Sequence, residues 1–129
     1  MTSPSAPLAI EGNWQMVRAE FGGEAAPELV TRETELEFRA GAYAVRYAGQ
    51  VMDQGRYEWI VEEASGHLVL HGTQGTNAGR RIPCLCQLVG DRLRICYGLD
   101  GVRPAAFTAG VDRTRYLVGY RRSGPTGSA

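Results

Sequence analysis

Apolar and polar residues alternate along much of this chain, in short stretches that turn-forming residues separate. Residues 34–39 show the pattern most clearly, because Leu36 and Phe38 fall on one face of a strand and the charged residues between them on the other. Similar stretches bounded by Gly, Asp or Ser indicate further strands. Besides residues 34–39, the predicted strands are residues 12–21, 43–47, 55–62, 67–71, 82–89, 92–97 and 115–121.

The order of these strands predicts the fold class. Parallel strands need crossovers of about a dozen residues or more, and most of the connections here are shorter. An antiparallel meander that closes on itself also removes exposed strand edges. Pro27 and the following Glu-Leu-Val predict a short helical turn between residues 24 and 32, which we expect to cap one barrel end. We therefore expect an all-β protein: a single eight-stranded antiparallel up-and-down β-barrel with one short helical turn after the first strand.

Length and composition agree with one domain. The chain has 129 residues, enough for one core and too few for two ordinary domains. Residues 1–7 and 123–129 are rich in Pro, Ser or Gly, so we expect both ends to be disordered and residues 8–122 to form the barrel.

Charge and cysteine content narrow the expected partners and compartment. With 14 basic and 14 acidic residues, the surface as a whole is not drawn to nucleic acid or anionic membrane. No stretch reaches the roughly 20 apolar residues of a membrane span. The first eight residues do not resemble a signal peptide, and the three cysteines are an odd number. We expect a cytoplasmic protein with free thiols, monomeric or weakly dimeric, that binds no nucleic acid.

The first and last predicted strands resemble the lipocalin and calycin pattern. Gly12-Asn-Trp14 opens the first strand, and Tyr120-Arg-Arg122 closes the last. The resemblance implies that the indole of Trp14 plugs the closed end and that a guanidinium lies over it, a contact worth about 0.5–2 kcal/mol. We assign the guanidinium to Arg121, although strand alternation allows Arg122 equally well.

Several motifs together resemble one bacterial family of small, functionally uncharacterised domains with a lipocalin-like barrel. They are Leu8-Ala-Ile-Glu-Gly-Asn-Trp-Gln-Met-Val17, Gly-Glu-Ala-Ala-Pro-Glu-Leu-Val, Leu93-Arg-Ile-Cys-Tyr97, Arg103-Pro-x-x-Phe107 and the final Tyr-x-x-x-Tyr-Arg. The resemblance covers about residues 8–122. It implies the fold and carries no agreed activity.

Aromatic residues are abundant where that family is often rich in Lys and Asp. These aromatic residues form a stripe on the inner face of the predicted barrel. They either fill its core, where each buries roughly 150–250 Å², or line a ligand cavity. The candidate ligand-binding residues are Phe38, Tyr43, Tyr47, Tyr57, Trp59, Tyr97 and Arg103.

The Arg103-Pro-x-x-Phe107 motif predicts a shaped loop. Proline fixes its own backbone and favours an extended conformation at Arg103, so the loop can fold back with Phe107 as its anchor. We expect a lid or plug at one barrel end. In the functional alternative, Arg103 meets an anionic ligand at the mouth.

Signals for catalysis, metals and cofactors are weak. His67 and His71 are about 13 Å apart along a strand, too far to share a metal ion. Cys84 and Cys86 share one strand face, whereas alternation places Cys96 on the opposite face. Residues 72–81 are Gly-rich with two arginines, which favours a flexible hairpin over an anion-binding nest. We expect no metal site, no cofactor and no catalytic residues that the sequence can name.

Three functions remain open for such a barrel. The favoured one is binding of a small apolar or amphipathic molecule in the interior. The second is a non-redox enzyme of cyclase or isomerase type that uses the same cavity, with tyrosines as hydrogen-bond donors. The third is a filled barrel that serves as an interaction domain.

Overall fold

The computed structural model describes residues 10–62, 65–110 and 114–123. The predicted disordered segments fall outside these ranges, apart from Ser123. One short helix, α1, spans Glu28–Glu33. The strands are β1 (Gly12–Phe21), β2 (Glu24–Ala25), β3 (Thr34–Arg39), β4 (Ala42–Tyr47), β5 (Gln50–Glu62), β6 (Ser65–Gly75), β7 (Arg81–Val89), β8 (Arg92–Gly98) and β9 (Arg115–Arg122).

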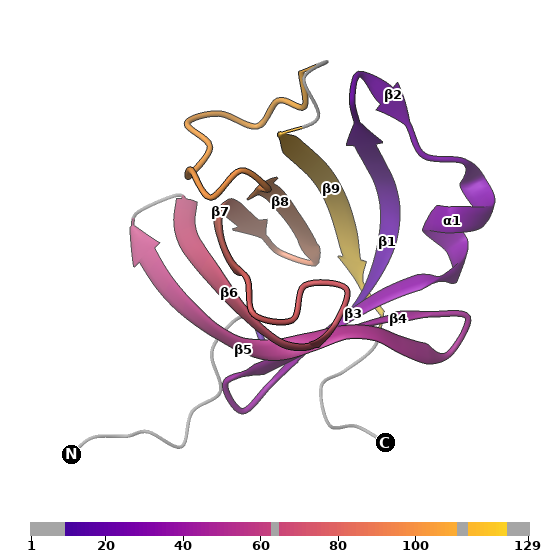
Figure 1. The fold of residues 1–129 in the computed structure, drawn as a ribbon. Coiled ribbons are helices and arrows are strands. Elements are labelled where there is room, and N and C mark those ends of the chain that lie inside the picture. The colour runs from indigo at the N-terminus through magenta and orange to yellow at the C-terminus, as the bar shows by residue number, and fades with distance from the viewer. Residues whose placement is uncertain (1–9, 63–64, 111–113, 124–129) are drawn as a thin grey trace.

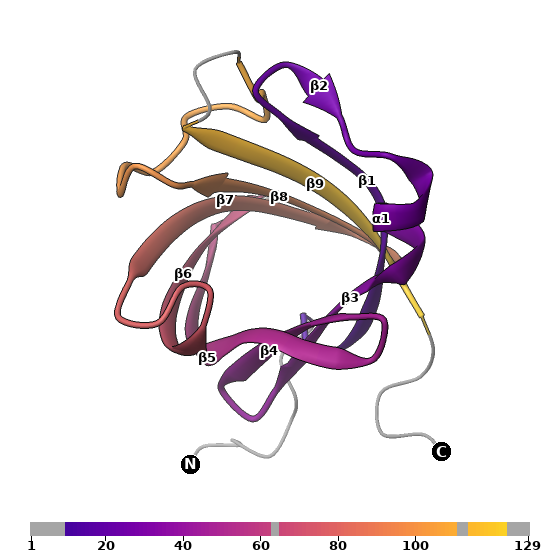
Figure 2. The same ribbon diagram turned by 45° about the vertical axis from the view of Figure 1, so that its right-hand side comes forward.

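Eight of these strands form a closed antiparallel barrel, as the alternation predicted (Figures 1 and 2). From β3 to β9 each strand pairs with the next in the chain, and β1 pairs with both β3 and β9 to close the ring. The two-residue β2 pairs with the end of β1 alone. Closure leaves the eight barrel strands without a free edge.

The closing seam between β1 and β9 contains a bulge. Its register runs from Trp14 opposite Arg122 to Phe21 opposite Tyr116, and it shifts between Met16 and Arg18. The shift leaves Val17 out of the pairing. A bulge bends its strand and increases the local twist, which a small barrel needs in order to close.

The helix α1 forms where Pro27 predicts a helical turn, and it lies beside β1 (Figure 1). The side-chain amide of Gln15 on β1 donates hydrogen bonds to the carbonyl oxygens of Thr31 and Thr34, at 2.8 and 3.1 Å. The hydroxyl of Thr34 donates to the carbonyl oxygen of Val30 at 2.6 Å. These bonds occupy carbonyls that a helix end leaves unpaired.

One continuous apolar core lies inside the barrel. Cys84 and Cys86 belong to it, and both are fully buried. Cys96 is also buried but lies outside this cluster, on the opposite face of its strand, as the alternation predicted. The other large, fully buried members are Ile10, Trp14, Leu36, Phe38, Leu68, Ile82, Leu93, Ile95 and Val118.

Two strands are longer than the sequence predicts. β5 begins at Gln50 rather than residue 55, and β6 continues to Gly75, into the Gly-rich segment. The backbone of Gly75 has φ +90°, and a Cβ there would collide with the carbonyl oxygen of Met52 on β5. Glycine therefore allows the β6–β7 connection to pack directly against β5.

Candidate ligand cavity at the open end of the barrel

The barrel is plugged at the end where β1 begins. The indole nitrogen of Trp14 donates a hydrogen bond to the carbonyl oxygen of Ile10 at 2.9 Å, and the Trp14 side chain is fully buried. The guanidinium of Arg122 lies 4.3 Å from the centre of the indole. It also donates to the carbonyl oxygen of Glu11 at 2.8 Å. The assignment to Arg121 is therefore wrong: Arg121 follows the inward-facing Tyr120 and is exposed.

Three predicted ligand residues, Phe38, Tyr57 and Trp59, belong to the apolar core or pack against it. The hydroxyl of Tyr57 donates to a carboxylate oxygen of Glu11 at 2.7 Å, and its ring packs edge-on against Phe38 with 4.8 Å between centroids. Trp59 is partly buried against the same core, and its indole lies 3.1 Å from the position that a Cβ at Gly66 would take. None of these three aromatic side chains lines the cavity at the opposite end of the barrel.

The opposite end of the barrel contains a cavity of about 200 Å³. Each of the eight barrel strands contributes at least one lining residue. An apolar cavity of roughly 150 Å³ is known to hold a benzene molecule, so this space suits a single-ring compound. Its apolar lining residues are Met16, Val45, Met52, Leu70, Ile82 and Leu99.

Three tyrosines from β8 and β9 line one side of the cavity. The hydroxyls of Tyr97 and Tyr120 are 2.6 Å apart and share one hydrogen bond, and the ring of Tyr116 packs against that of Tyr97 with 5.5 Å between centroids. Two hydroxyls carry two protons, and one bond uses only one of them. No second hydrogen bond of either hydroxyl occurs within the described part of the chain. One proton of the pair therefore remains to be donated.

Burial keeps these tyrosines neutral. It raises the pKa of Tyr97 well above the usual value, and the adjacent Tyr120 raises it further. Burial likewise raises the pKa of Tyr120, although the hydrogen bond with Tyr97 acts in the opposite direction. At neutral pH both hydroxyls are protonated, so they act as hydrogen-bond donors and not as bases.

On the side of the cavity opposite the tyrosines, β5 contributes a carboxylate, that of Asp53. Asp53 is 6% exposed, and within the described ranges it is the one buried side chain that ordinarily carries a charge. It accepts hydrogen bonds from the Tyr43 hydroxyl at 3.2 Å and from the backbone and side-chain nitrogens of Asn77, at 3.1 and 2.8 Å. Asn77 belongs to the β6–β7 connection, which curls over the open end of the barrel (Figures 1 and 2). Thr34 and Thr76 complete the polar lining.

The cavity contains few of the residues predicted to bind a ligand. Tyr97 lines it, and Tyr43 reaches its wall through Asp53. Tyr47 is 37% exposed at the end of β4, and Arg103 is exposed and does not line the cavity.

Four polar lining residues that the sequence analysis missed differ in the signal that the sequence carries for them. Tyr116 and Tyr120 alternate with the buried Val118, so the period of two along the last strand already indicates their inward orientation. Asp53 and Asn77 had no such signal, because both lay outside the predicted strands.

The loop between β8 and β9 does not cover the mouth in the way that the Arg103-Pro-x-x-Phe107 motif predicts. The guanidinium of Arg94, on the outer face of β8, lies 3.9 Å from the centre of the Phe107 ring. On the same face the thiol of Cys96 lies 3.5 Å from the carbonyl oxygen of Thr108. A Cβ at Gly98 would collide with the carbonyl oxygen of Val102, so glycine lets the loop approach the outside of the barrel.

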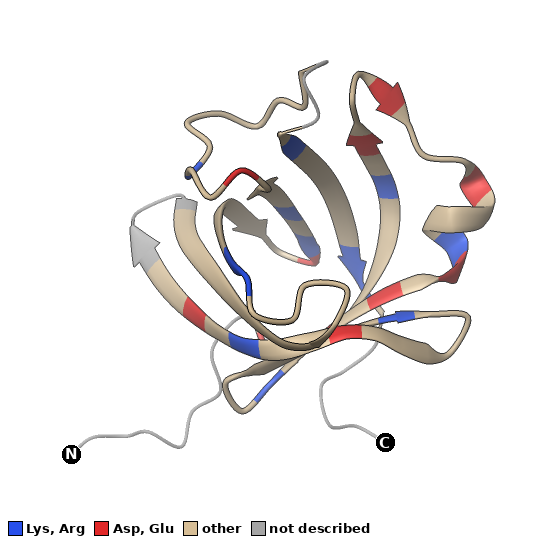
Figure 3. Ribbon diagram, in the orientation of Figure 1, with Lys and Arg blue, Asp and Glu red and all other residues tan. Residues whose placement is uncertain are grey.

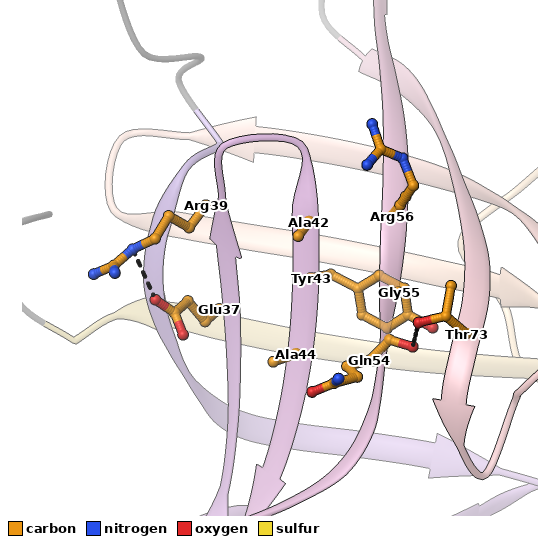
Figure 4. A pocket seen from close by; sticks show the side chains of 9 residues that line it. All are labelled: Glu37, Arg39, Ala42, Tyr43, Ala44, Gln54, Gly55, Arg56 and Thr73. Atoms are coloured by element: carbon orange, nitrogen blue, oxygen red, sulfur yellow. Dashed lines mark hydrogen bonds and ion pairs between the residues drawn. The ribbon is translucent and has the colours of Figure 1, made fainter.

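A larger hollow of about 390 Å³ lies on the outer face of β3, β4 and β5 (Figure 4). Its floor includes the small side chains of Ala42 and Ala44. The carboxylate of Glu37 at its edge pairs with Arg39 at 3.3 Å and with Arg46 at 2.7 Å. Because this hollow faces solvent and its carboxylate is already paired, we do not regard it as the site.

Charges and metal ligands give no competing site. Arginines and acidic residues both occur around the barrel (Figure 3). In the described ranges no group of three His, Cys, Asp or Glu side chains could hold a metal ion, and His71 instead contacts Glu58 at 2.8 Å. None of the helices described is long and apolar enough to cross a membrane.

Comparisons with models of known protein families, with curated proteins and with solved structures find no match for this chain.

Proposed function

We propose that this protein binds a small, largely apolar molecule inside the open end of its barrel. The observation that carries the proposal is the lining of the 200 Å³ cavity, in which six apolar side chains surround a few convergent polar groups. Ligand sites generally combine an apolar body with a small number of placed donors and acceptors. The remaining proton of the Tyr97–Tyr120 pair would orient a ligand by donating to its oxygen or nitrogen.

The enzyme alternative would use the same cavity. Burial raises the pKa of Tyr97 and Tyr120, so their hydroxyls would act as hydrogen-bond donors there as well. A proton-abstracting reaction would need another group as its base.

We also propose that the chain is lipocalin-like and belongs with the bacterial domains whose motifs it resembles. The closed eight-stranded barrel and the Trp14–Arg122 plug support this proposal. The cytoplasmic assignment is likewise a proposal, and the three free, buried cysteines support it.

The proposal can be tested by screening single-ring and short aliphatic compounds against the purified protein, by native mass spectrometry and ligand-observed NMR. Thr76 lines the cavity and is exposed, so Thr76→Trp should obstruct the cavity without overpacking the core. Thr73→Trp is the matched control, because Thr73 is exposed on the same hairpin but lines the outer hollow.

We expect the screen to find compounds that bind the wild type and Thr73→Trp with Kd below about 100 μM. Thr76→Trp should not bind these compounds. If no compound binds, or if Thr76→Trp binds as well as the wild type, the ligand-binding proposal fails. The interaction-domain alternative would then stand.

A further inference from the structure

One of the residues that line the cavity is a buried carboxyl group. Asp53 is held by three hydrogen bonds whose donors, the Tyr43 hydroxyl and two nitrogens of Asn77, are all neutral. Across the described ranges Asp53 has no ion pair. Buried carboxylates are normally compensated by a cation, because hydrogen bonds from neutral groups offset only part of the lost hydration.

The nearest arginine in the hydrogen-bond network is committed elsewhere. Arg80 donates to the side-chain oxygen of Asn77 at 3.0 Å and to the carbonyl oxygen of Leu99 at 2.6 Å. It is exposed, and it does not line the cavity. Arg80 therefore positions Asn77 and joins the segments around Asn77 and Leu99, and it does not pair with Asp53.

The remaining lining residues favour a cation and disfavour an anion. The lining contains no Arg or His, and three tyrosines lie on its wall. An aromatic face attracts a cation, and the attraction grows as water is excluded. A carboxylate offers about four acceptor positions, of which three are used here, so one is left for a ligand N–H group.

We propose that the cavity selects a small amine: a compact apolar body of about one ring with an ammonium group that pairs with Asp53. This inference rests on the proposed ligand-binding function and specifies its chemistry. It also reverses the preference for acids that Arg103 at the mouth would have given, since Arg103 is not part of the cavity wall.

Three probes of one shape test the inference: benzylamine, benzyl alcohol and benzoate, titrated at neutral pH and low salt by calorimetry or NMR. In the wild type we expect benzylamine to bind at least tenfold more tightly than benzyl alcohol, and benzoate to bind most weakly. Asp53→Asn should abolish the advantage of benzylamine. Asp91→Asn removes the same charge from an exposed turn between β7 and β8, and it should preserve that advantage.

The outcomes separate the inference from the function on which it rests. Equal binding of benzylamine and benzyl alcohol to the wild type overturns the amine preference and leaves ligand binding intact. Preferred binding of benzoate overturns it as well, and so does an undiminished preference for benzylamine in Asp53→Asn. If Asp53→Asn does not fold, the ranking of the three probes on the wild type decides. If none of the three probes binds and the screen also finds no ligand, both proposals fail.

Discussion

The guanidinium of Arg122 lies 4.3 Å from the centre of the Trp14 indole, and the two residues face each other across the seam between β9 and β1. The contact joins the first and last strands at the end of the barrel that is fully packed. A planar cation over an aromatic face, with a further hydrogen bond to the carbonyl oxygen of Glu11, fixes the place where the ring closes.

Loss of this plug should destabilise the barrel in a graded way. Trp14→Ala should lower the free energy of unfolding by about 3–5 kcal/mol, as truncation of a buried aromatic does. Arg122→Ala should cost about 1–3 kcal/mol, since it removes the cation–π contact and a hydrogen bond from a charged group. Arg121→Ala is the control and should stay within about 0.5 kcal/mol, because that side chain is exposed. Denaturant unfolding measures all three, and equal losses for the two arginines would contradict the assignment.

The Tyr97–Tyr120 pair should show energetic coupling. Tyr97→Phe or Tyr120→Phe alone breaks the 2.6 Å bond and should cost about 1 kcal/mol. The double variant should cost less than the sum of the two, because no hydroxyl is then left without its partner. Tyr47→Phe, at an exposed position, controls for the loss of a hydroxyl. Additive losses in the unfolding free energy would show that the two hydroxyls do not interact.

Stability should fall in alkaline solution. Burial raises the pKa of Cys84 and Cys86 above the usual 9.0, and of Tyr97 and Tyr120 above the usual 10.0. The folded state therefore holds these protons more tightly than the unfolded chain does. Their contribution is complete below about pH 9 and is lost progressively as the pH rises beyond it. Unfolding midpoints at pH 7, 9 and 10.5 test this, and a midpoint unchanged at pH 10.5 would be inconsistent with buried, neutral groups.

The β6–β7 connection should depend on Gly75 more than on Gly79. Both have positive φ, +90° and +81°, so alanine is strained at either position. At Gly79 a Cβ would meet open space, and Gly79→Ala should cost about 1 kcal/mol from backbone strain. At Gly75 a Cβ would collide with the carbonyl oxygen of Met52, so Gly75→Ala should cost clearly more and loosen the contact of Asn77 with Asp53. Similar unfolding free energies for the two variants would rule out a tightly packed mouth.

The fold could be predicted from the sequence because alternation is a local signal. Leu36 and Phe38 face inward with Trp14, as their spacing indicates, and the pairing of β1 with β9 follows from eight antiparallel strands in order. Alternation left Arg121 and Arg122 equally possible, and the observed contact of Arg122 with Trp14 decides between them.

The candidate site was less predictable, since loop contacts place its polar groups. Asp53 is buried because Asn77, on a loop distant in sequence, covers it. The alternation of residues along β5 does not predict that contact. Phe107 lies against Arg94 on the outer face of β8, and Gly98 admits the close approach of Val102 in the same loop. A motif centred on Pro104 reveals neither contact.

The central claim, a ligand site at the open end of the barrel, is tested most directly by methyl NMR during titration of a bound compound from the screen. Ile82 and Leu70 line the cavity, whereas Ile95 and Leu36 are buried in the core and do not line it. The claim predicts chemical-shift changes and ligand contacts at the methyl groups of Ile82 and Leu70, with little change at Ile95 and Leu36. Contacts confined to outer-face residues, or equal shifts at all four, would contradict it.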